Sequence, residues 1–290
     1  MQLDYDALAA LAAILRTGSF DGAAAELGLT QPAISLRIKT LEDRVGAILI
    51  RRGRPCTATP TGARLNRHAE EVGLLEKTLT ADLGGLLPDR DRPLRLAINA
   101  DSLATWVLPA LAEVEGFRYD ITVDDQDHSA DWLKRGEVSA AITAHAAPIP
   151  GCDATPLGAL GYAATCAPGF AARWFAQGVT PEALNHAPCL AFDRKDRLQH
   201  AWVASALGLR VALPLHYLPA AMMGLGWGMN PVAIAAPMLA DGRLVELIPD
   251  HRISTPLYWQ VSRQTAAALD PLTKGLRRAA RKILEEPGVT

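Results

Sequence analysis

Residues 17–62 constrain the fold of this 290-residue chain more than any other stretch. Ser19 can cap a first helix, whose apolar positions recur at i, i+3, i+4 and i+7 and form one buried stripe: Phe20, Ala23, Ala24 and Leu27. Thr30 is an N-cap candidate for a second helix, and Pro32 lies in its first turn, where its missing N–H costs nothing. The spacing therefore predicts two short helices joined by a short turn.

The second helix is predicted to bury one narrow sector, made of Ile34, Ile38, Leu41 and Val45. We expect its remaining surface to enter a DNA major groove, as the second helix of a helix-turn-helix does, through Gln31, Pro32, Ser35, Leu36, Arg37 and Lys39. A helical hairpin with a solvated basic face is the alternative interpretation of this pattern alone.

Charge favours a nucleic-acid surface. Residues 31–67 contain eight Lys and Arg against two acidic residues, a net charge of +6, whereas the whole chain carries −2. Neutralising phosphates supplies most non-specific DNA affinity, so this basic segment indicates where DNA binds. Arg51, Arg52 and Arg54 follow the second helix and are predicted to form a wing that grips the phosphate backbone.

This stretch resembles the N-terminal motif of LysR-type transcriptional regulators, matched at Gly18-Ser19-Phe20, Ala23-Ala24, Leu27, Gln31-Pro32-Ala33, Ser35, Leu41-Glu42, Gly46, Arg51 and Thr61-Gly62. Leu36 departs from the family, in which this outward position is often polar, and it predicts an apolar base contact such as a thymine methyl. Length and organisation also agree, so the resemblance covers essentially the whole chain.

The resemblance implies an α/β fold overall: a winged helix-turn-helix, a long linker helix and a two-lobed α/β effector domain similar to type 2 periplasmic binding proteins. It implies promoter DNA, a small effector, RNA polymerase and further copies of the chain, as homodimer or homotetramer, as partners. We expect the DNA-binding domain at 1–60, the dimerisation helix and hinge at 61–92 and the effector domain at 93–290. Its first lobe is expected at 93–160 and 262–290, and its second at 161–261.

The long helix from Thr61 to about Leu86 repeats apolar residues every seven positions, at Leu65, Val72, Leu79 and Leu86. This spacing predicts a dimer seam, although packing on its own domain is the alternative. Beyond it, alternating patterns predict strands at 94–98, 119–123, 140–143, 163–166 and 190–192, separated by helices, as in an α/β sheet. The chain is expected to leave the first lobe near Gly161 and to return near Tyr258–Val261.

A narrower resemblance, to the branch of ArgP and LysG regulators, rests on Asn99–Trp106, Asp125–His128, Pro150–Cys152, Leu225–Met229 and Pro256–Gln260. That branch senses lysine or arginine and controls basic amino-acid export. The resemblance implies L-lysine or L-arginine as effector, no cofactor, and activation of an exporter gene. The segment from His216 to Leu225 is shorter than is usual in the branch by about seven residues, roughly two helical turns.

Candidate effector residues follow the predicted strands, because ligands in open α/β folds sit beyond the carboxyl ends of strands. Ser102 opens a helix after the first strand and can donate to a carboxylate, although capping of that helix by Ser102 or Asp101 is an equal alternative. Asp125 and Asp127, beside His128, suit an ammonium or guanidinium group. The residues alone favour a solvated loop there, and the ligand role rests on the resemblance.

The second lobe adds further candidates. Phe192, Asp193 and Asp196 follow a predicted strand and can close over a ligand. Trp227, between two glycines, is a packing residue or stacks on the ligand. Trp106 ends the first motif of the narrower resemblance and completes the set of effector-binding candidates.

Composition and motifs exclude several other classes. The four cysteines form no Cys-x-x-Cys pair, so buried thiols are favoured over a metal or redox site. No Gly-x-Ser-x-Gly surrounds Ser102 and no phosphate loop occurs, which disfavours an enzyme. No long apolar run or signal peptide is present, which predicts a cytoplasmic, nucleoid-associated protein without membrane contact. A regulator with another effector, a replication-origin or nucleoid binder, and an amino-acid-binding protein without a DNA role stay as alternatives.

Overall fold

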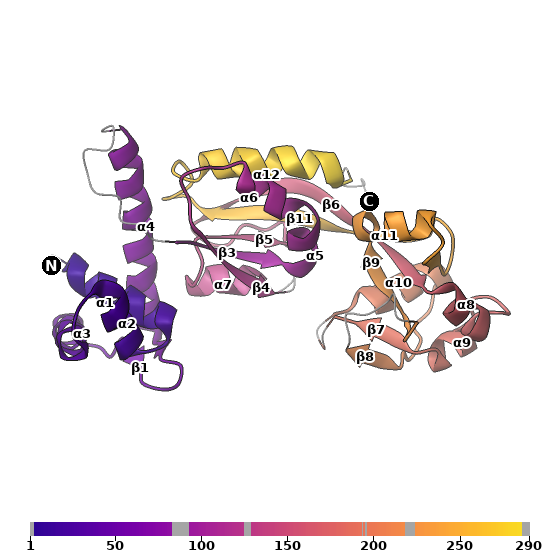
Figure 1. The fold of residues 1–290 in the computed structure, drawn as a ribbon, viewed down its shortest axis with the longest axis horizontal. Coiled ribbons are helices and arrows are strands. Elements are labelled where there is room, and N and C mark those ends of the chain that lie inside the picture. Colours follow the sequence, from indigo (N-terminus) through magenta and orange to yellow (C-terminus); the bar gives the residue numbers. More distant parts are fainter. Residues whose placement is uncertain are drawn as a thin grey trace.

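The computed structural model describes residues 3–82, 93–124, 129–192, 194, 196–217 and 224–285. The molecule is elongated, with a helical domain at one end and two α/β lobes beyond it (Figure 1). The predicted hinge at 83–92 lies outside the described residues. No helix in the described ranges is long and apolar enough to cross a bilayer.

The helical domain comprises α1 (Tyr5–Thr17), α2 (Phe20–Leu27), α3 (Gln31–Val45), β1 (Ile50–Arg51), β2 (Thr57–Ala58) and the start of α4 (Pro60–Asp82). Its core is formed mainly by aliphatic side chains of α1 and α3, including Leu11, Ile34 and Leu41. The predicted apolar sectors of α2 and α3 are confirmed, with Leu27 and Val45 partly buried at the edge of that core.

The long helix α4 leaves the helical domain and runs past the first lobe (Figure 1). Leu65 packs against the core of its own helical domain, which is the alternative that the heptad pattern left open. Leu74 packs against the core of the first lobe, and Leu75 is half exposed. A dimer seam along α4 stays a prediction.

The two lobes share one sheet, built from β3 (Leu94–Asn99), β4 (Tyr119–Asp124), β5 (Ala140–Thr143), β6 (Cys152–Cys166), β7 (Cys189–Ala191), β8 (Leu215–Tyr217), β9 (Trp227–Pro231), β10 (Val245–Glu246) and β11 (Arg252–Ser262). The strand order is β4-β3-β5-β11-β6-β9-β7-β8, and β10 pairs with β6. β3 is parallel to β4 and β5 in the first lobe, and β7 is parallel to β8 and β9 in the second.

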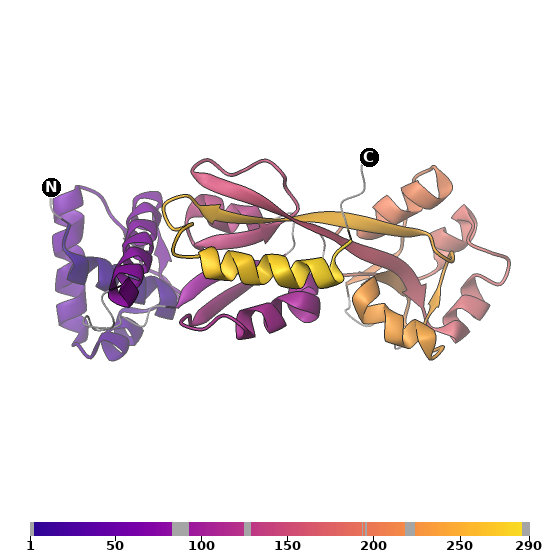
Figure 2. The ribbon, with the colours of Figure 1, turned by 90° about the horizontal axis from the view of Figure 1, so that it is seen from above.

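Two long antiparallel strands, β6 and β11, run side by side from one lobe into the other (Figure 2). The expected strand at 163–166 is only the end of β6, because β11 supplies hydrogen-bond partners back to Cys152. Tyr258–Val261 already pairs with β5 of the first lobe. This is the stretch where the chain was expected to return to the first lobe, and one strand, β11, serves both lobes.

Helices cover both faces of the sheet. They are α5 (Ala100–Ser102), a π-helical turn (Leu103–Val107), α6 (Leu108–Ala112), α7 (Ser129–Arg135), α8 (Pro168–Trp174), α9 (Pro181–His186), α10 (Leu198–Leu207), α11 (Val232–Ala240) and α12 (Asp270–Ile283). Side chains alternate along β3, so Leu96 and Ile98 meet the core beneath α12, and Ala97 meets that beneath α7. Figure 2 shows α12 lying along the first-lobe strands.

Candidate functional sites at the recognition helix and between the lobes

Side-chain caps fix where α2 and α3 begin. Ser19 Oγ accepts a hydrogen bond from the backbone N–H of Gly22 at 3.0 Å, and Thr30 Oγ1 accepts one from Ala33 at 3.4 Å. Each cap satisfies a backbone donor that has no partner inside the helix. Both caps were predicted, and they set the two helices in the helix-turn-helix arrangement.

The outward side of α3 carries most of the predicted DNA contacts. Gln31, Pro32, Leu36 and Lys39 are exposed, and Ser35 is half-buried between them. Leu36 stands out because 65% of an apolar side chain faces solvent there. Pro32, Leu36 and Lys39 lie within one sector of the helix opposite the core, Ser35 lies on the flank of that sector, and Gln31 is exposed at the first residue of the helix. α3 therefore presents a compact, mixed apolar and polar face.

Arg37 lies apart from this face. It sits on the flank next to α1, where its Nη2 is 3.5 Å from Asp6 Oδ2. Consecutive helix residues are about 100° apart, so Arg37 points away from the outward direction of Leu36. The structure thus places Pro32, Leu36 and Lys39 together on the outward face and Arg37 on the flank toward α1.

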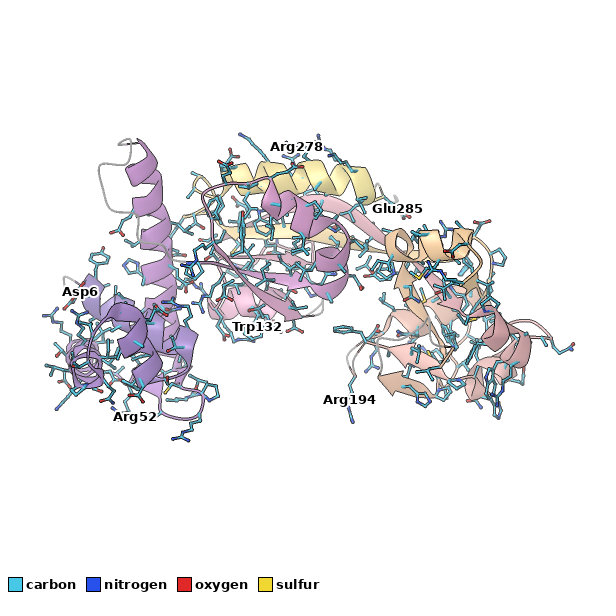
Figure 3. All side chains as sticks on the ribbon, in the orientation of Figure 1. Asp6, Arg52, Trp132, Arg194, Arg278 and Glu285 are labelled. Atoms are coloured by element: carbon cyan, nitrogen blue, oxygen red, sulfur yellow. The ribbon has the colours of Figure 1, made fainter. Side chains whose placement is uncertain are left out.

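The hairpin β1–β2 forms the predicted wing. Arg51, Arg52 and Arg54 are all exposed, and Arg52 lies at the edge of the helical domain (Figure 3). The guanidinium carbon of Arg52 is 5.0 Å from the centre of the Phe20 ring, a cation–π contact that orients the side chain. Basic side chains at a hairpin tip are suited to phosphate oxygens.

Gly62 locks the wing to α4. A Cβ atom at this position would stand 2.0 Å from the carbonyl oxygen of Leu49, which is backbone and cannot move aside cheaply. Thr59 Oγ1 adds hydrogen bonds to the carbonyls of Ile48 and Leu49, at 2.7 and 3.3 Å. The Thr61-Gly62 dipeptide thus has a packing reason, because it lets the start of α4 pack closely against the segment that leads into β1.

The second candidate site lies where β3 ends. Ser102 is fully buried, and its Oγ has no hydrogen-bond partner within the described part of the chain. One turn on, Trp106 is also buried, and its Nε1 is likewise without a described partner. Asn99, not Asp101 or Ser102, occupies the N-cap position of α5, and it makes no side-chain cap bond. Ser102 stands directly before the π-helical turn, and its side chain makes no cap bond there.

A carboxylate from each lobe lies near this site. Tyr162 Oη donates to Asp101 Oδ2 at 2.7 Å. Burial is the main cause that raises the pKa of Asp101, the bond from Tyr162 opposes it, and the negative charge of Asp196 raises it further. Asp101 belongs to the first lobe and Asp196 to the second, so the two carboxylates interact across the interlobe region.

Asp196 is held rigidly. It is 6% exposed and accepts hydrogen bonds from the N–H groups of Phe192 and Leu198, both at 3.0 Å, and from Gln199 Nε2 at 2.8 Å. Phe192 is 52% exposed beside it. A buried carboxylate with fixed donors keeps one position, which suits it to a cationic ligand group.

Two sequence matches identify the family. Residues 5–63 match the bacterial regulatory helix-turn-helix proteins of the lysR family, and residues 89–284 match the LysR substrate binding domain. The chain belongs to the LysR family. It is thus a transcriptional regulator and not an enzyme, and both the winged helix-turn-helix and the two-lobed effector domain expected from the sequence are confirmed.

Relatives of this LysR-type regulator cover nearly its whole length. The HTH-type transcriptional regulator LysG of Mycobacterium tuberculosis (strain ATCC 25618 / H37Rv) is 40% identical over 286 residues, covering 96% of this chain and 94% of the relative. The crystal structure of ArgP from Mycobacterium tuberculosis superposes with a TM-score of 0.83 at 39% identity, covering 98% of this chain and 100% of that one. The predicted resemblance to the ArgP and LysG branch is confirmed.

A third relative was solved with a ligand. Full-length LysG from Corynebacterium glutamicum with bound effector Arg is similar to this LysR-type chain at a TM-score of 0.70 and 33% identity. The match covers 98% of this chain and 100% of that one.

The effector candidates divide into three groups in this LysR-type regulator. Ser102, Phe192 and Asp196 lie at or beside the interlobe site, and Trp106 is buried in the first-lobe core one turn after Ser102. Trp227 is fully buried in the core of the second lobe, with its ring centre 5.5 Å from that of Trp202, so it has the packing role. The remaining candidates lie outside the described residues: Asp125, Asp127, His128 and Asp193.

Sequence reasoning missed Tyr162 as a site residue and treated Asp101 only as a cap. The one available signal was that Tyr162 is the single aromatic side chain in the small-residue stretch 158–166. Its partner is 61 positions away in the chain. Only the tertiary fold brings α5, which carries Asp101, into contact with β6, which carries Tyr162.

The four cysteines fit the predicted role of buried thiols. Cys56, Cys152, Cys166 and Cys189 are all free and buried. Burial raises the pKa of Cys166 to about 11 and also raises that of Cys189, which disfavours the reactive thiolate. The described ranges contain no group of three or more His, Cys, Asp or Glu placed to hold a metal.

Proposed function

We propose that this LysR-type regulator binds promoter DNA through α3 and the wing, and that L-arginine or L-lysine switches this binding. The observation that carries the effector assignment is the interlobe grouping of Ser102, Asp101 and Asp196. An amino acid with a basic side chain brings a carboxylate for the Ser102 hydroxyl and cationic groups for the two carboxylates. The arginine-bound LysG relative supports the same class of ligand.

In the DNA complex, the exposed side of α3 lies in the major groove. Gln31 and Lys39 are placed to hydrogen-bond base edges or phosphates, and Leu36 is placed to contact a thymine methyl. Arg51, Arg52 and Arg54 neutralise phosphates beside the groove, so affinity falls steeply with salt. Arg37 contributes through its flank position near α1.

The working unit is a homodimer or homotetramer. A LysR-type recognition helix reads one half-site, and a second copy reads another about one DNA turn away. The regulator acts in the cytoplasm, at the nucleoid, where it contacts RNA polymerase and activates a basic amino-acid exporter gene. A replication-origin or nucleoid role uses the same DNA surface.

A second candidate is a LysR-type regulator with a different effector. The observation that favours it is the short segment between His216 and Leu225, which belongs to the second lobe. An amino-acid-binding protein without a DNA role is disfavoured by the helix-turn-helix match over residues 5–63.

Isothermal titration with L-arginine, L-lysine and L-citrulline tests the proposal. L-citrulline has the shape of arginine without its positive charge, so the two carboxylates should reject it. We expect Ser102→Ala to weaken arginine binding roughly tenfold, since a hydrogen bond to a charged group contributes about 1.5–3 kcal/mol. Ser205→Ala, at an exposed serine of α10, is the matched control. Equal binding of citrulline and arginine would contradict the assignment.

A further inference from the structure

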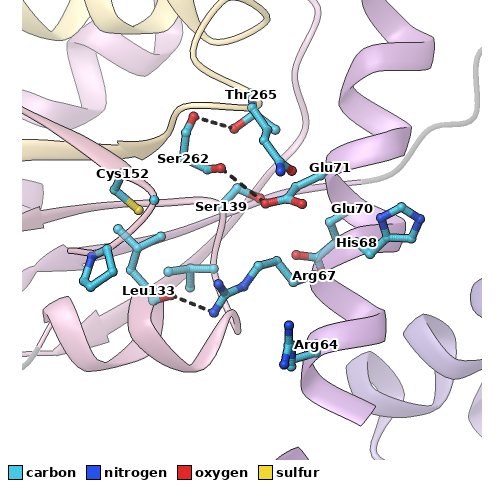
Figure 4. A pocket seen from close by; sticks show the side chains of 14 residues that line it. Arg64, Arg67, His68, Glu70, Glu71, Leu133, Ser139, Cys152, Ser262 and Thr265 are labelled. Carbon is cyan, nitrogen blue, oxygen red and sulfur yellow. Dashed lines mark hydrogen bonds between the residues drawn. The ribbon is translucent and has the colours of Figure 1, made fainter. Parts of the chain in front are cut away.

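The linker helix α4 is fastened to the first lobe by polar side chains (Figure 4). The Nη2 of Arg67 donates to the carbonyls of Leu133 at 3.3 Å and Lys134 at 2.8 Å, in the last turn of α7. Carbonyl groups at a helix C-terminus lack partners inside the helix and carry the negative end of its dipole. Arg67 of α4 therefore donates hydrogen bonds to carbonyl groups at the end of α7 and places a positive charge at the negative end of that helix dipole.

Gly136 leaves the space that this arginine fills. It follows α7 with a φ of 71°, and a Cβ atom there would stand 2.2 Å from Arg67 Nε. The positive φ alone favours glycine, and any larger residue would displace the guanidinium from its place. The contact between α4 and α7 thus depends on the backbone of α7 and its following residue, through the two carbonyl acceptors and the missing Cβ of Gly136.

Two neighbouring acidic residues on α4 hold other elements of the same lobe. Glu70 forms an ion pair with Arg95 on β3. Glu71 Oε1 accepts a hydrogen bond from Ser262 Oγ, at the last residue of β11, over 3.2 Å. One face of α4 therefore contacts three elements of the lobe. It reaches α7 through hydrogen bonds to backbone carbonyls, β3 through an ion pair, and β11 through a hydrogen bond between side chains.

All three of these elements lead to the interlobe site. β3 ends beside Asp101 and Ser102, and β11 is one of the two strands that run between the lobes. α7 is joined to the end of β4 by a 2.8 Å bond from Trp132 Nε1 to Asp124 Oδ2. Movement of one lobe against the other therefore reaches the residues that α4 holds.

The interface is hollow as well as polar. A cavity of 260 Å³ lies between α4 and the first lobe, bordered by Arg64, Arg67, His68, Glu71, Cys152 and Gln264 (Figure 4). Polar interfaces within a chain favour relative motion of the parts they join, because little apolar burial is lost when they shift. The hydrogen bonds of Arg67 and Glu71 and the ion pair of Glu70 therefore hold α4 on the lobe together with the apolar contact of Leu74.

We propose that Arg67 and Glu71 are positioning residues that couple the effector domain to the DNA-binding domain of the same chain. This inference rests on the proposed function, because it says how effector binding at the interlobe site changes the position of the DNA-binding domain. A shift of α7 or of the end of β11 turns α4. Since Gly62 locks α4 to the wing, that turn re-aims the recognition helix.

The test uses the full-length protein and a duplex selected by the wild-type protein from a random-sequence pool. The affinity for L-arginine is measured with and without this DNA. The ratio of the two affinities is the coupling, and it is reciprocal between the two ligands. We expect Arg67→Ala to move the ratio at least fivefold toward one, while arginine affinity without DNA stays within about twofold of wild type.

Arg64→Ala is the matched control, because Arg64 lies one turn earlier on the same helix, is exposed and borders the same cavity. It removes the same charge and should keep the wild-type ratio. Gly136→Ala should reproduce Arg67→Ala by displacing the guanidinium. A wild-type ratio in Arg67→Ala would overturn the inference.

A second readout needs no effector, so failure of the proposed amino acid is separable from failure of the coupling. Hydrogen exchange of residues 129–139 should be faster in Arg67→Ala than in wild type or Arg64→Ala, at unchanged melting temperature. The length of DNA that the protein protects should change in Arg67→Ala alone. If arginine fails to bind wild type but the footprint changes in this way, the coupling stands and the amino acid is wrong. An unchanged footprint overturns the coupling.

Discussion

Replacing Asp101 by Asn separates the stability of this regulator from its response to a basic amino acid. In the native protein burial raises the pKa of Asp101, so the folded state keeps its proton at pH values where the unfolded chain has lost it. A raised folded pKa gives stability that is present at low pH and is lost as the pH rises from 3.8 through the folded value. The ionised carboxyl is therefore unfavourable for folding at neutral pH.

Asn keeps the acceptor oxygen that Tyr162 uses at 2.7 Å, but it carries no charge. We therefore expect Asp101→Asn to be at least as stable as wild type at pH 7, with the difference growing in its favour as the pH rises from 4. The affinity of Asp101→Asn for arginine should be lower than that of wild type. Losing one charge-assisted hydrogen bond costs about 1.5–3 kcal/mol, which is roughly a 10- to 150-fold weaker affinity.

Thermal unfolding and isothermal titration on the same samples measure both effects. In wild type, arginine affinity should fall as the pH is lowered, because protonation of Asp101 removes an acceptor. Asp101→Asn should therefore reduce this pH dependence of arginine affinity. A less stable variant with wild-type affinity would refute the reasoning, since it would make Asp101 a structural residue.

Three further predictions follow from contacts elsewhere in the chain. Arg52→Ala should lower the slope of log affinity against log salt by about one, measured by fluorescence anisotropy on duplex DNA, and an unchanged slope would remove Arg52 from the phosphate contacts. Gly62→Ala should destabilise the protein by about 1–3 kcal/mol in urea unfolding, because its Cβ meets the Leu49 carbonyl, whereas Gly169→Ala, with open space around it, should be near neutral. Cys166 should resist iodoacetamide at pH 8 in the native protein and react after unfolding, as read by mass spectrometry, and rapid native labelling would contradict its raised pKa and burial.

The helix-turn-helix could be predicted closely because its determinants are local. Ser19 and Thr30 each cap a helix within three residues of themselves, and the apolar stripe of α3 repeats with the helical period. Arg37 shows the limit of this reasoning. Its flank position was visible in the periodicity, but its contact with Asp6 depends on how α1 packs.

Strand lengths were less predictable than strand positions. The expected strand at 140–143 has the observed bounds, since β5 is short and fully buried. The expected 163–166 became the last part of β6, because a strand extends as far as a partner supplies hydrogen bonds. Residues 152–162 carry no strong alternating pattern, and β11 pairs with them from almost a hundred positions later in the sequence.

The sequence by itself determined the family and the helix-turn-helix, and it predicts a DNA-contacting face and an effector site at the end of β3, because these depend on short-range periodicity, capping and motif spacing. Tertiary structure alone decided that Asp101 meets Tyr162 and Asp196, that Trp227 is buried against Trp202, and that Arg67 reaches the end of α7. Those contacts join residues far apart in the chain. No local pattern records them, since each one joins helices or strands that meet only in the folded chain.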